Sequence, residues 1–310
     1  MMRGLMRGSR ARKFLLCLVA PLCANYFAYY GFVTHYSVGV FTPQGFLAQY
    51  GQEVFKYRVL GQALLMAVYR VLEYVNPADA GWTRHAAFLG TDTINFYHSY
   101  FFLNTLFLCL TLLVVSDRLG DLELLVITLL VAITQYVVVP YDAAAYFFLA
   151  CTYRWRRNLP LTAAVVFLAT LNRETAALSL SLYAALLLLG RGGSLRGLAL
   201  LTGIFLATYL SLRVVYGWED AVGAEFTFFR YLNLNSAIGV GFALAAGYAL
   251  ARRPARAGLF LLFSLPYILS IFITGNPFEV RLWVPLLLGI MFVQASDSEE
   301  ESPATPALQT

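Results

Sequence analysis

The amino-acid sequence predicts an all-α fold: a polytopic transmembrane helix bundle of about 10 spans, with an amphipathic interfacial helix in the first outer loop. Of its 310 residues, 60% are hydrophobic and only 13% are charged, and the mean hydropathy is +0.68. A soluble domain is about 45–50% apolar and about 25% charged. The chain therefore has too little polar material to cover a water-facing surface, which excludes a soluble enzyme, a disordered chain and a disulfide scaffold. Successive apolar segments with basic residues beside them predict the same class.

The first predicted span runs from Phe14 to about Val33 and follows a basic N-terminus. A signal peptide opens in the same way, but this apolar run is too long for one and no A-x-A cleavage site follows it. We expect a transmembrane helix whose basic end lies in the cytoplasm. The basic residues are Arg3, Arg7, Arg10, Arg12 and Lys13.

The longest predicted loop, residues 34–96, joins the first two spans on the outer side of the membrane. Within it, the segment Val59–Val75 carries apolar residues at positions 60, 64, 68, 71, 72 and 75, which is helical spacing. Polar residues interrupt this pattern. We therefore predict an amphipathic helix that lies in the plane of the membrane interface.

Further apolar segments predict the remaining spans, and several are shorter than the roughly 20 residues that a perpendicular helix needs. We therefore expect some of these helices to be broken. The segments are 97–116, 122–139, 143–153, 160–171, 176–190, 198–216, 236–251, 259–273 and 282–295.

The distribution of basic residues supports this arrangement, because cytoplasmic loops carry an excess of Lys and Arg. The ten-span arrangement places 14 of the 22 Lys and Arg residues in the cytoplasm. One long helix over residues 160–190 would turn two later Arg clusters outward, so two helices joined by an outer turn are expected. We predict one integral membrane domain, residues 1–295, and a disordered acidic tail, residues 296–310, with both termini cytoplasmic.

Because 20 of the 22 basic residues are Arg, we expect a GC-rich bacterial genome and hence the bacterial inner membrane.

Charged residues in three outer turns need an explanation, because a charge at mid-bilayer depth costs roughly 2.5–3.5 kcal/mol. These turns carry Asp142, the pair Arg173 and Glu174, and the pair Glu279 and Arg281. Taken singly, each pair is most simply a structural ion pair that ties helix ends together. Taken together, three acid-bearing turns and the polar first loop converge on one face of the bundle, which favours a pocket.

A pocket with several Arg residues suits a phosphate-bearing substrate, since guanidinium groups present paired donors to phosphate oxygens. A carboxylate can take the proton of an attacking hydroxyl group. The candidate catalytic acids are Glu53, Asp142 and Glu174, and the choice among them stays open. The candidate substrate-binding residues are Lys56, Arg58, Tyr141, Asn172, Arg173, Glu279 and Arg281.

The sequence predicts no cofactor or metal site, and a need for a divalent metal stays open. His35, His85 and His98 match no metal-binding spacing, and the four Cys residues lie in apolar stretches, as core residues do. A nucleotide-binding loop, a dinucleotide fingerprint and a nucleophile elbow are all lacking. Basic residues beside apolar runs indicate contact with anionic membrane lipids and not with nucleic acid.

These features resemble the GT-C superfamily of integral membrane glycosyltransferases. The resemblance covers most of residues 14–295: a basic first span, a long outer loop with an amphipathic helix, many later spans and four short motifs. It implies a donor sugar carried on a polyprenyl phosphate and used at the outer face. In that superfamily an acid in or near the first outer loop commonly acts as base or orients the acceptor. The motifs are Phe55-Lys56-Tyr57-Arg58-Val59-Leu60, Tyr141-Asp142, Asn172-Arg173-Glu174-Thr175 and Glu279-Val280-Arg281.

In this chain no Asp closely follows the first span, and Glu53 is the nearest acid in the loop. We expect no soluble C-terminal domain of the kind common in the superfamily, and this expectation favours a lipid or glycan acceptor over a protein. The leading hypothesis is transfer of a sugar from a polyprenyl-phosphate-linked donor to a lipid or polysaccharide acceptor. Two alternatives stay open: a flippase or transporter for lipid-linked glycan intermediates, and a non-catalytic membrane subunit of a polysaccharide assembly complex. A transporter should show an internal repeat and a polar path to the cytoplasm, and neither is visible.

Overall fold

The chain forms a bundle of helices. The computed structural model describes residues 10–31, 41–51, 53–75, 91–218, 234–273 and 275–295. Within these ranges every regular element is helical, so the predicted all-α class is confirmed. The predicted acidic tail, residues 296–310, lies outside the described residues.

Each apolar segment of the sequence corresponds to a helix. The first predicted span is one continuous helical segment made of α1 (Arg10–Phe14), η1 (Leu15–Val19), α2 (Ala20–Tyr26) and η2 (Phe27–Gly31). The first loop contains α3 (Pro43–Tyr50), the 3-10 helix η3 (Glu53–Tyr57) and α4 (Val59–Val75). The later elements are α5 (Thr91–Val115), α6 (Asp121–Thr134), α7 (Asp142–Trp155), α8 (Leu159–Asn172), η6 (Glu174–Ala176), α9 (Ala177–Leu188), α10 (Leu195–Tyr216), α11 (Leu234–Leu250), α12 (Pro254–Phe263), α13 (Leu265–Ile273) and α14 (Val280–Ala295).

Three helix bounds differ clearly from the predicted ones. α5 begins at Thr91, so the first loop ends earlier than residue 96. α6 ends at Thr134 and not at residue 139, because the Gln135 side chain donates from Nε2 to the Val131 carbonyl oxygen (3.2 Å) and Pro140 favours an extended residue before it. The predicted span 259–273 starts earlier and bends by 63° between α12 and α13, so this helix is broken.

Among the described residues, three helical segments are long and apolar enough to cross a membrane: Arg10–Gly31, Ile94–Val115 and Leu195–Tyr216. The bent pair of α12 and α13 adds a fourth if it forms one span. The other apolar helices, such as α8 and α14, are shorter. The helices are therefore observed, whereas the number of spans stays a prediction.

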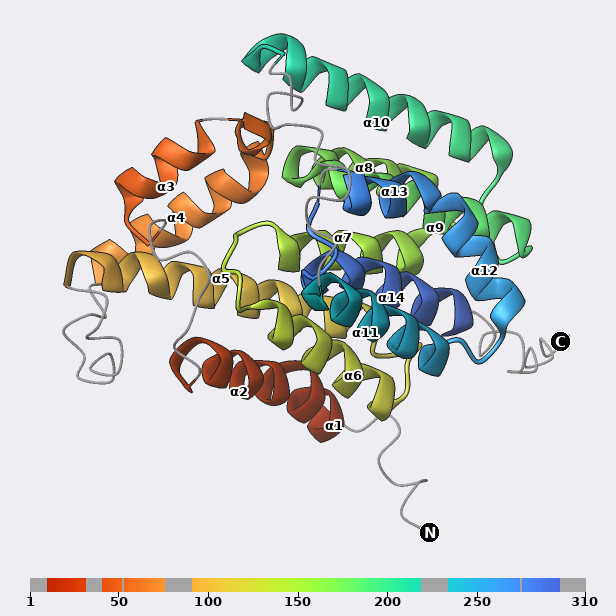
Figure 1. Cartoon of the computed structure of the whole chain (residues 1–310), viewed down its shortest axis with the longest axis horizontal. Coiled ribbons are helices and arrows are strands. Elements are labelled where there is room, and N and C mark those ends of the chain that lie inside the picture. The colour runs from red at the N-terminus through yellow and green to blue at the C-terminus, as the bar shows by residue number, and fades with distance from the viewer. Residues whose placement is uncertain are drawn as a thin grey trace, which may run out of the picture.

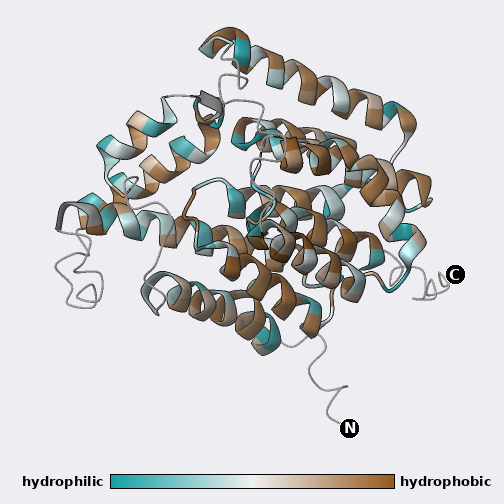
Figure 2. Ribbon diagram, in the orientation of Figure 1, coloured by the Kyte–Doolittle hydropathy of each residue, from teal (hydrophilic) through white to brown (hydrophobic). Residues whose placement is uncertain are grey.

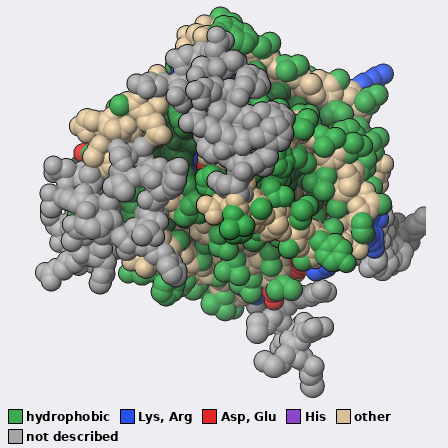
Figure 3. All heavy atoms as spheres, in the orientation of Figure 1, with side chains coloured by type: hydrophobic (Ala, Val, Ile, Leu, Met, Phe, Trp, Pro, Cys, Tyr) green, Lys and Arg blue, Asp and Glu red, His purple; other side chains and the backbone are tan. Residues whose placement is uncertain are grey.

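α7 lies at the centre of the bundle, where it packs against α5, α8, α9 and α14 (Figure 1). Hydrophobic residues make up most of these helices (Figure 2), and they form the core around α7. α10 lies at the edge against α8 and leaves much of its apolar surface exposed. On the face of the molecule seen in Figure 3, hydrophobic side chains dominate the described residues and charged side chains are few.

Basic residues mark one end of the bundle, here called the basic end. Two of its ion pairs join the start of the first helix to α6 and to the loop before α6. A third joins the loop after α11 to α6. α7 runs about 20 Å from Asp142 to Trp155, so Asp142 lies at the end opposite the Arg residues that follow α7. The ion pairs of the basic end are Arg12–Asp121 (2.5 Å), Lys13–Asp117 (2.7 Å) and Arg252–Glu123 (2.6 Å).

α4 has the bounds predicted for the amphipathic helix. One face of it packs on α5 and α8 and buries Gly61 and Leu65. Val71, Tyr74 and Val75 near its C-terminal end are exposed. The helix is thus observed, and its location in a membrane interface stays a prediction.

Candidate functional site

Six charged residues meet at the end of the bundle opposite the basic end, and we call them the charged cluster. They come from four separate segments of the chain, and all six are candidates from the sequence. Three are arginines and three are acids, so their formal charges cancel. The members are Arg58, Asp142, Arg173, Glu174, Glu279 and Arg281.

Asp142 connects the largest part of the charged cluster. It is the first residue of α7, and its two carboxylate oxygens have different partners. Oδ1 accepts from Arg173, and Oδ2 accepts from Nη1 of Arg281 at 3.3 Å. Only 3% of the Asp142 side chain is exposed. A carboxylate this deeply buried needs compensating partners, and the ends of α8 and α14 supply them.

The turn between α8 and α9 directs two neighbouring charges to different partners. Arg173 has an extended backbone, with φ −168° and ψ 148°, so its side chain and that of Glu174 point in different directions. Arg173 pairs with Asp142. Glu174 pairs instead with Arg58, whose Nη2 lies 2.5 Å from Oε1 and whose Nε lies 3.3 Å from Oε2. The predicted turn between the two helices is therefore observed, but Arg173 and Glu174 do not form the ion pair considered from the sequence.

Glu174 is the most exposed acid of the charged cluster, with 38% of its side chain exposed against 6% for Arg58. It lies in the turn between α8 and α9. Burial by itself raises the pKa of Glu174, but the guanidinium groups of Arg58 and Arg173 outweigh burial and lower the pKa to about 2. Glu174 is therefore ionised at neutral pH while Arg58 holds it.

The buried ring of Tyr141 contacts two arginines of the charged cluster. The guanidinium carbon of Arg58 lies 4.3 Å from the ring centroid, and that of Arg173 lies 5.0 Å from it. Such cation–π contacts contribute roughly 0.5–2 kcal/mol each. The backbone of Tyr141 is held as well, because Asn172 donates from Nδ2 to its carbonyl oxygen at 2.9 Å. Both sequence candidates thus lie beside the arginines.

The turn before α14 holds the third acid. Glu279 accepts from Nδ2 of Asn276 at 2.8 Å and from Nε of Arg281 at 2.6 Å. Trp283 donates from Nε1 to the Pro277 carbonyl oxygen at 2.9 Å and fixes the same turn. The expected Glu279–Arg281 pair is therefore present. Asn276 is not among the candidate residues from the sequence. The feature that could have indicated it is the Asn–Pro step beside a charged pair.

Gly61 allows α4 to approach the charged cluster closely. A Cβ atom at this position would lie 3.1 Å from Cβ of Tyr141 and 3.2 Å from Oδ1 of Asn172. Arg58 comes directly before α4, so this approach places it against Glu174. Gly61 is not among the candidate residues from the sequence, although an isolated Gly inside a helical pattern commonly marks close packing.

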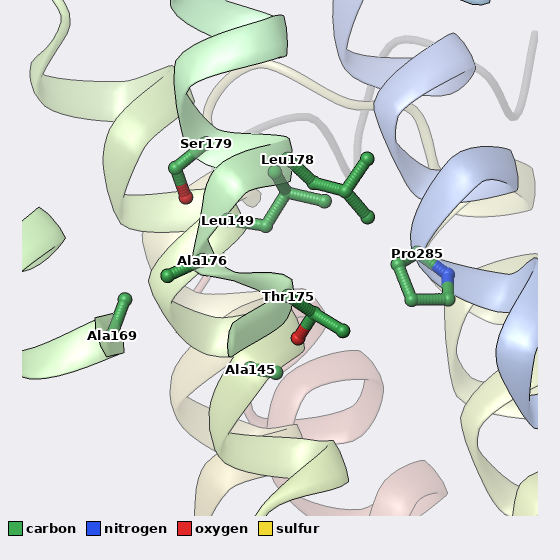
Figure 4. A pocket seen from close by; sticks show the side chains of 8 residues that line it. All are labelled: Ala145, Leu149, Ala169, Thr175, Ala176, Leu178, Ser179 and Pro285. Atoms are coloured by element: carbon green, nitrogen blue, oxygen red, sulfur yellow. The ribbon is translucent and has the colours of Figure 1, made fainter. Parts of the chain in front are cut away.

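A small cavity of about 10 Å³ is lined by residues of α7, α8, η6, α9 and α14 (Figure 4). Two of its lining residues, Ala145 and Pro285, lie about one helical turn from Asp142 and Arg281, and a third, Thr175, directly follows Glu174 in the chain. Such a volume suits about one water molecule. Its lining is made mostly of small side chains: Ala145, Leu149, Ala169, Thr175, Ala176, Leu178, Ser179 and Pro285.

Two other sequence candidates lie near Arg58 in the chain. Glu53 begins η3, and its side chain lies outside the described part of the structure. Lys56 has its Nζ 5.3 Å from the centroid of the Tyr57 ring. Among the described residues, no group of three or more His, Cys, Asp or Glu side chains could hold a metal ion.

Comparisons with known proteins add no assignment to this geometry. No protein-family model, curated protein or solved structure matches the chain.

Proposed function

We propose that this protein is an integral membrane glycosyltransferase of the bacterial inner membrane. It moves a sugar from a polyprenyl-phosphate-linked donor to a lipid or polysaccharide acceptor at the outer face. The convergence of three arginines and three acids at the end opposite the basic end carries this proposal. The resemblance of the surrounding motifs to the GT-C superfamily supports the same reaction class.

The distribution of charge supports an orientation with the basic end in the cytoplasm and the charged cluster outside. The first helix starts at the basic end, and Gln294 near the end of α14 exchanges hydrogen bonds with Arg253 there. Both termini then face the cytoplasm. α10 spans 22 residues, about 33 Å, which matches a hydrocarbon core of about 30 Å. Tyr216, the last residue of α10, and Trp218, two residues later, are exposed at its proposed outer end, where aromatic residues favour the membrane interface.

The geometry suggests a division of roles within the charged cluster. Arg58 and Arg173 bind the donor phosphate, since Arg58 meets the most accessible carboxylate and both contact Tyr141. Asp142 is a positioning residue, because both of its oxygens are engaged by arginines and its side chain is buried. Glu174 is the acid best placed to meet an acceptor, because it alone of the three is substantially exposed.

In the proposed reaction an acceptor hydroxyl oxygen attacks the anomeric carbon of the donor sugar. The bond from this carbon to the phosphate oxygen breaks, and polyprenyl phosphate leaves with the electron pair. Glu174 takes the hydroxyl proton. Arg58 and Arg173 stabilise the negative charge that develops on the leaving phosphate.

Labelled polyprenyl-phosphate sugars supplied to membranes that contain the protein test this proposal. Glu174→Gln should lower transfer by about 100-fold or more, the usual range for loss of a general base. Glu123→Gln is the matched control, because it removes one carboxylate of an ion pair at the basic end (2.6 Å to Arg252) and should keep transfer. Equal transfer by wild type and Glu174→Gln would remove Glu174 from the chemistry, and no transfer from any donor sugar would refute the proposed function.

A further inference from the structure

The charged cluster already satisfies its own charge before any substrate binds. Three guanidinium groups face three carboxylates, and each arginine has at least one carboxylate partner. A phosphate that enters this cluster either adds uncompensated negative charge or displaces a carboxylate. A buried, uncompensated charge is strongly unfavourable, so displacement is the cheaper course.

The three carboxylates differ in how easily each can leave. Asp142 is 3% exposed and accepts from two arginines. Glu279 is 8% exposed and is held by both Arg281 and Asn276. Glu174 is 38% exposed, pairs with Arg58 and lies in a short 3-10 turn. Glu174 is therefore the carboxylate that can most easily leave its ion pair and rotate into solvent.

The groups that remain after such a rotation suit a phosphate. The freed Nε and Nη2 atoms of Arg58 form a paired donor edge of the kind that binds phosphate oxygens. The rings of Phe55 and Tyr141 also contact this guanidinium group, whose carbon lies 5.1 and 4.3 Å from their centroids. Arg173 is 8% exposed, and its buried Nε has no hydrogen-bond partner, so a further donor is available beside the first.

We propose that Glu174 occupies an anion site on Arg58, beside Arg173, in the resting protein, and that the phosphate group of the ligand displaces it. The Glu174 carboxylate then competes with the phosphate for Arg58. Displacement also prepares the acid for the proposed reaction. Once Arg58 turns to the phosphate, the main cause of the low pKa of Glu174 is removed, and the carboxylate becomes a stronger base. The inference rests on the proposed function only in taking the ligand to carry a phosphate.

Equilibrium binding to the purified full-length protein in detergent tests the displacement. The probes are farnesyl phosphate, inorganic phosphate and, as the control without phosphate, farnesol. Glu174→Gln should bind farnesyl phosphate about 5-fold more tightly than wild type, because the neutral amide competes less for Arg58. Arg58→Gln should bind it at least about 10-fold more weakly, and Glu123→Gln should bind it as wild type does. Thermal unfolding of each variant verifies that it is folded.

The probes also separate the sources of the phosphate. A gain for both phosphates supports a site for the phosphate group itself, and a gain for farnesyl phosphate alone supports a site for a lipid headgroup. Unchanged or weaker binding by Glu174→Gln would overturn the displacement, and so would an equal gain for farnesol. The assay needs no sugar transfer, so its result is independent of the outcome of the transferase test.

Discussion

Replacement of Asp142 by Asn tests whether the charged cluster is organised around this residue. Asn has nearly the same shape, but it loses the charge that compensates Arg173 and Arg281. Only 3% of the Asp142 side chain is exposed, so the two arginines would be left buried without their carboxylate. Removal of one partner from a buried ion pair costs about 3–5 kcal/mol. We therefore expect Asp142→Asn to destabilise the protein by about this amount.

The melting temperature of the purified protein in detergent, followed by circular dichroism, measures this loss. For chains of this order of size, 1 kcal/mol shifts the melting temperature by about 2–4 °C, so a fall of roughly 6–20 °C is expected. Asp117→Asn is the matched control. Its ion pair with Lys13 measures 2.7 Å, and both side chains are exposed, 56% for Asp117 and 40% for Lys13. An exposed pair contributes about 0–1 kcal/mol, so the control should fall by less than about 4 °C.

A second substitution identifies the cause of the loss. Arg173→Met in the Asp142→Asn background removes one of the stranded charges and should restore part of the melting temperature. Equal melting temperatures for Asp142→Asn and Asp117→Asn would refute the view that Asp142 holds the charged cluster together. A further fall in the double variant would refute charge compensation as the reason.

Two further predictions test the placement of α4 and the orientation of the bundle. Gly61→Val should push α4 away from the start of α7, because even a Cβ lies within 3.1 Å of Tyr141, and should lower both transfer and farnesyl phosphate binding by about 10-fold. Wild-type binding in this variant would contradict the close approach. In a cysteine-free background, Trp218→Cys should react with an impermeant maleimide in intact cells, whereas Leu195→Cys should react only after permeabilisation. Labelling of both from the same side would show that α10 does not cross the membrane.

The local pattern of the sequence predicts much of the helical structure. Apolar residues at helical spacing place α4 at residues 59–75, as observed. The charges of Arg173 and Glu174 interrupt an otherwise apolar stretch and mark the break between α8 and α9. Both features are local, because a helix face or a turn depends on residues a few positions apart. The end of α6 was missed because the side chain of Gln135, a residue the sequence treats as part of the span, bonds back to the last turn.

The residue types along the chain show which positions are charged within apolar surroundings, and hence which turns are candidates for a site. How these charges pair depends on the packing of the helices. Neighbours in sequence, Arg173 and Glu174, select different partners because the extended backbone at Arg173 turns their side chains apart. The partner of Glu174 is Arg58, 116 residues away, and it arrives because Gly61 lets α4 pack against the start of α7. Such pairings depend on how whole helices pack, and no local pattern of residues encodes that arrangement.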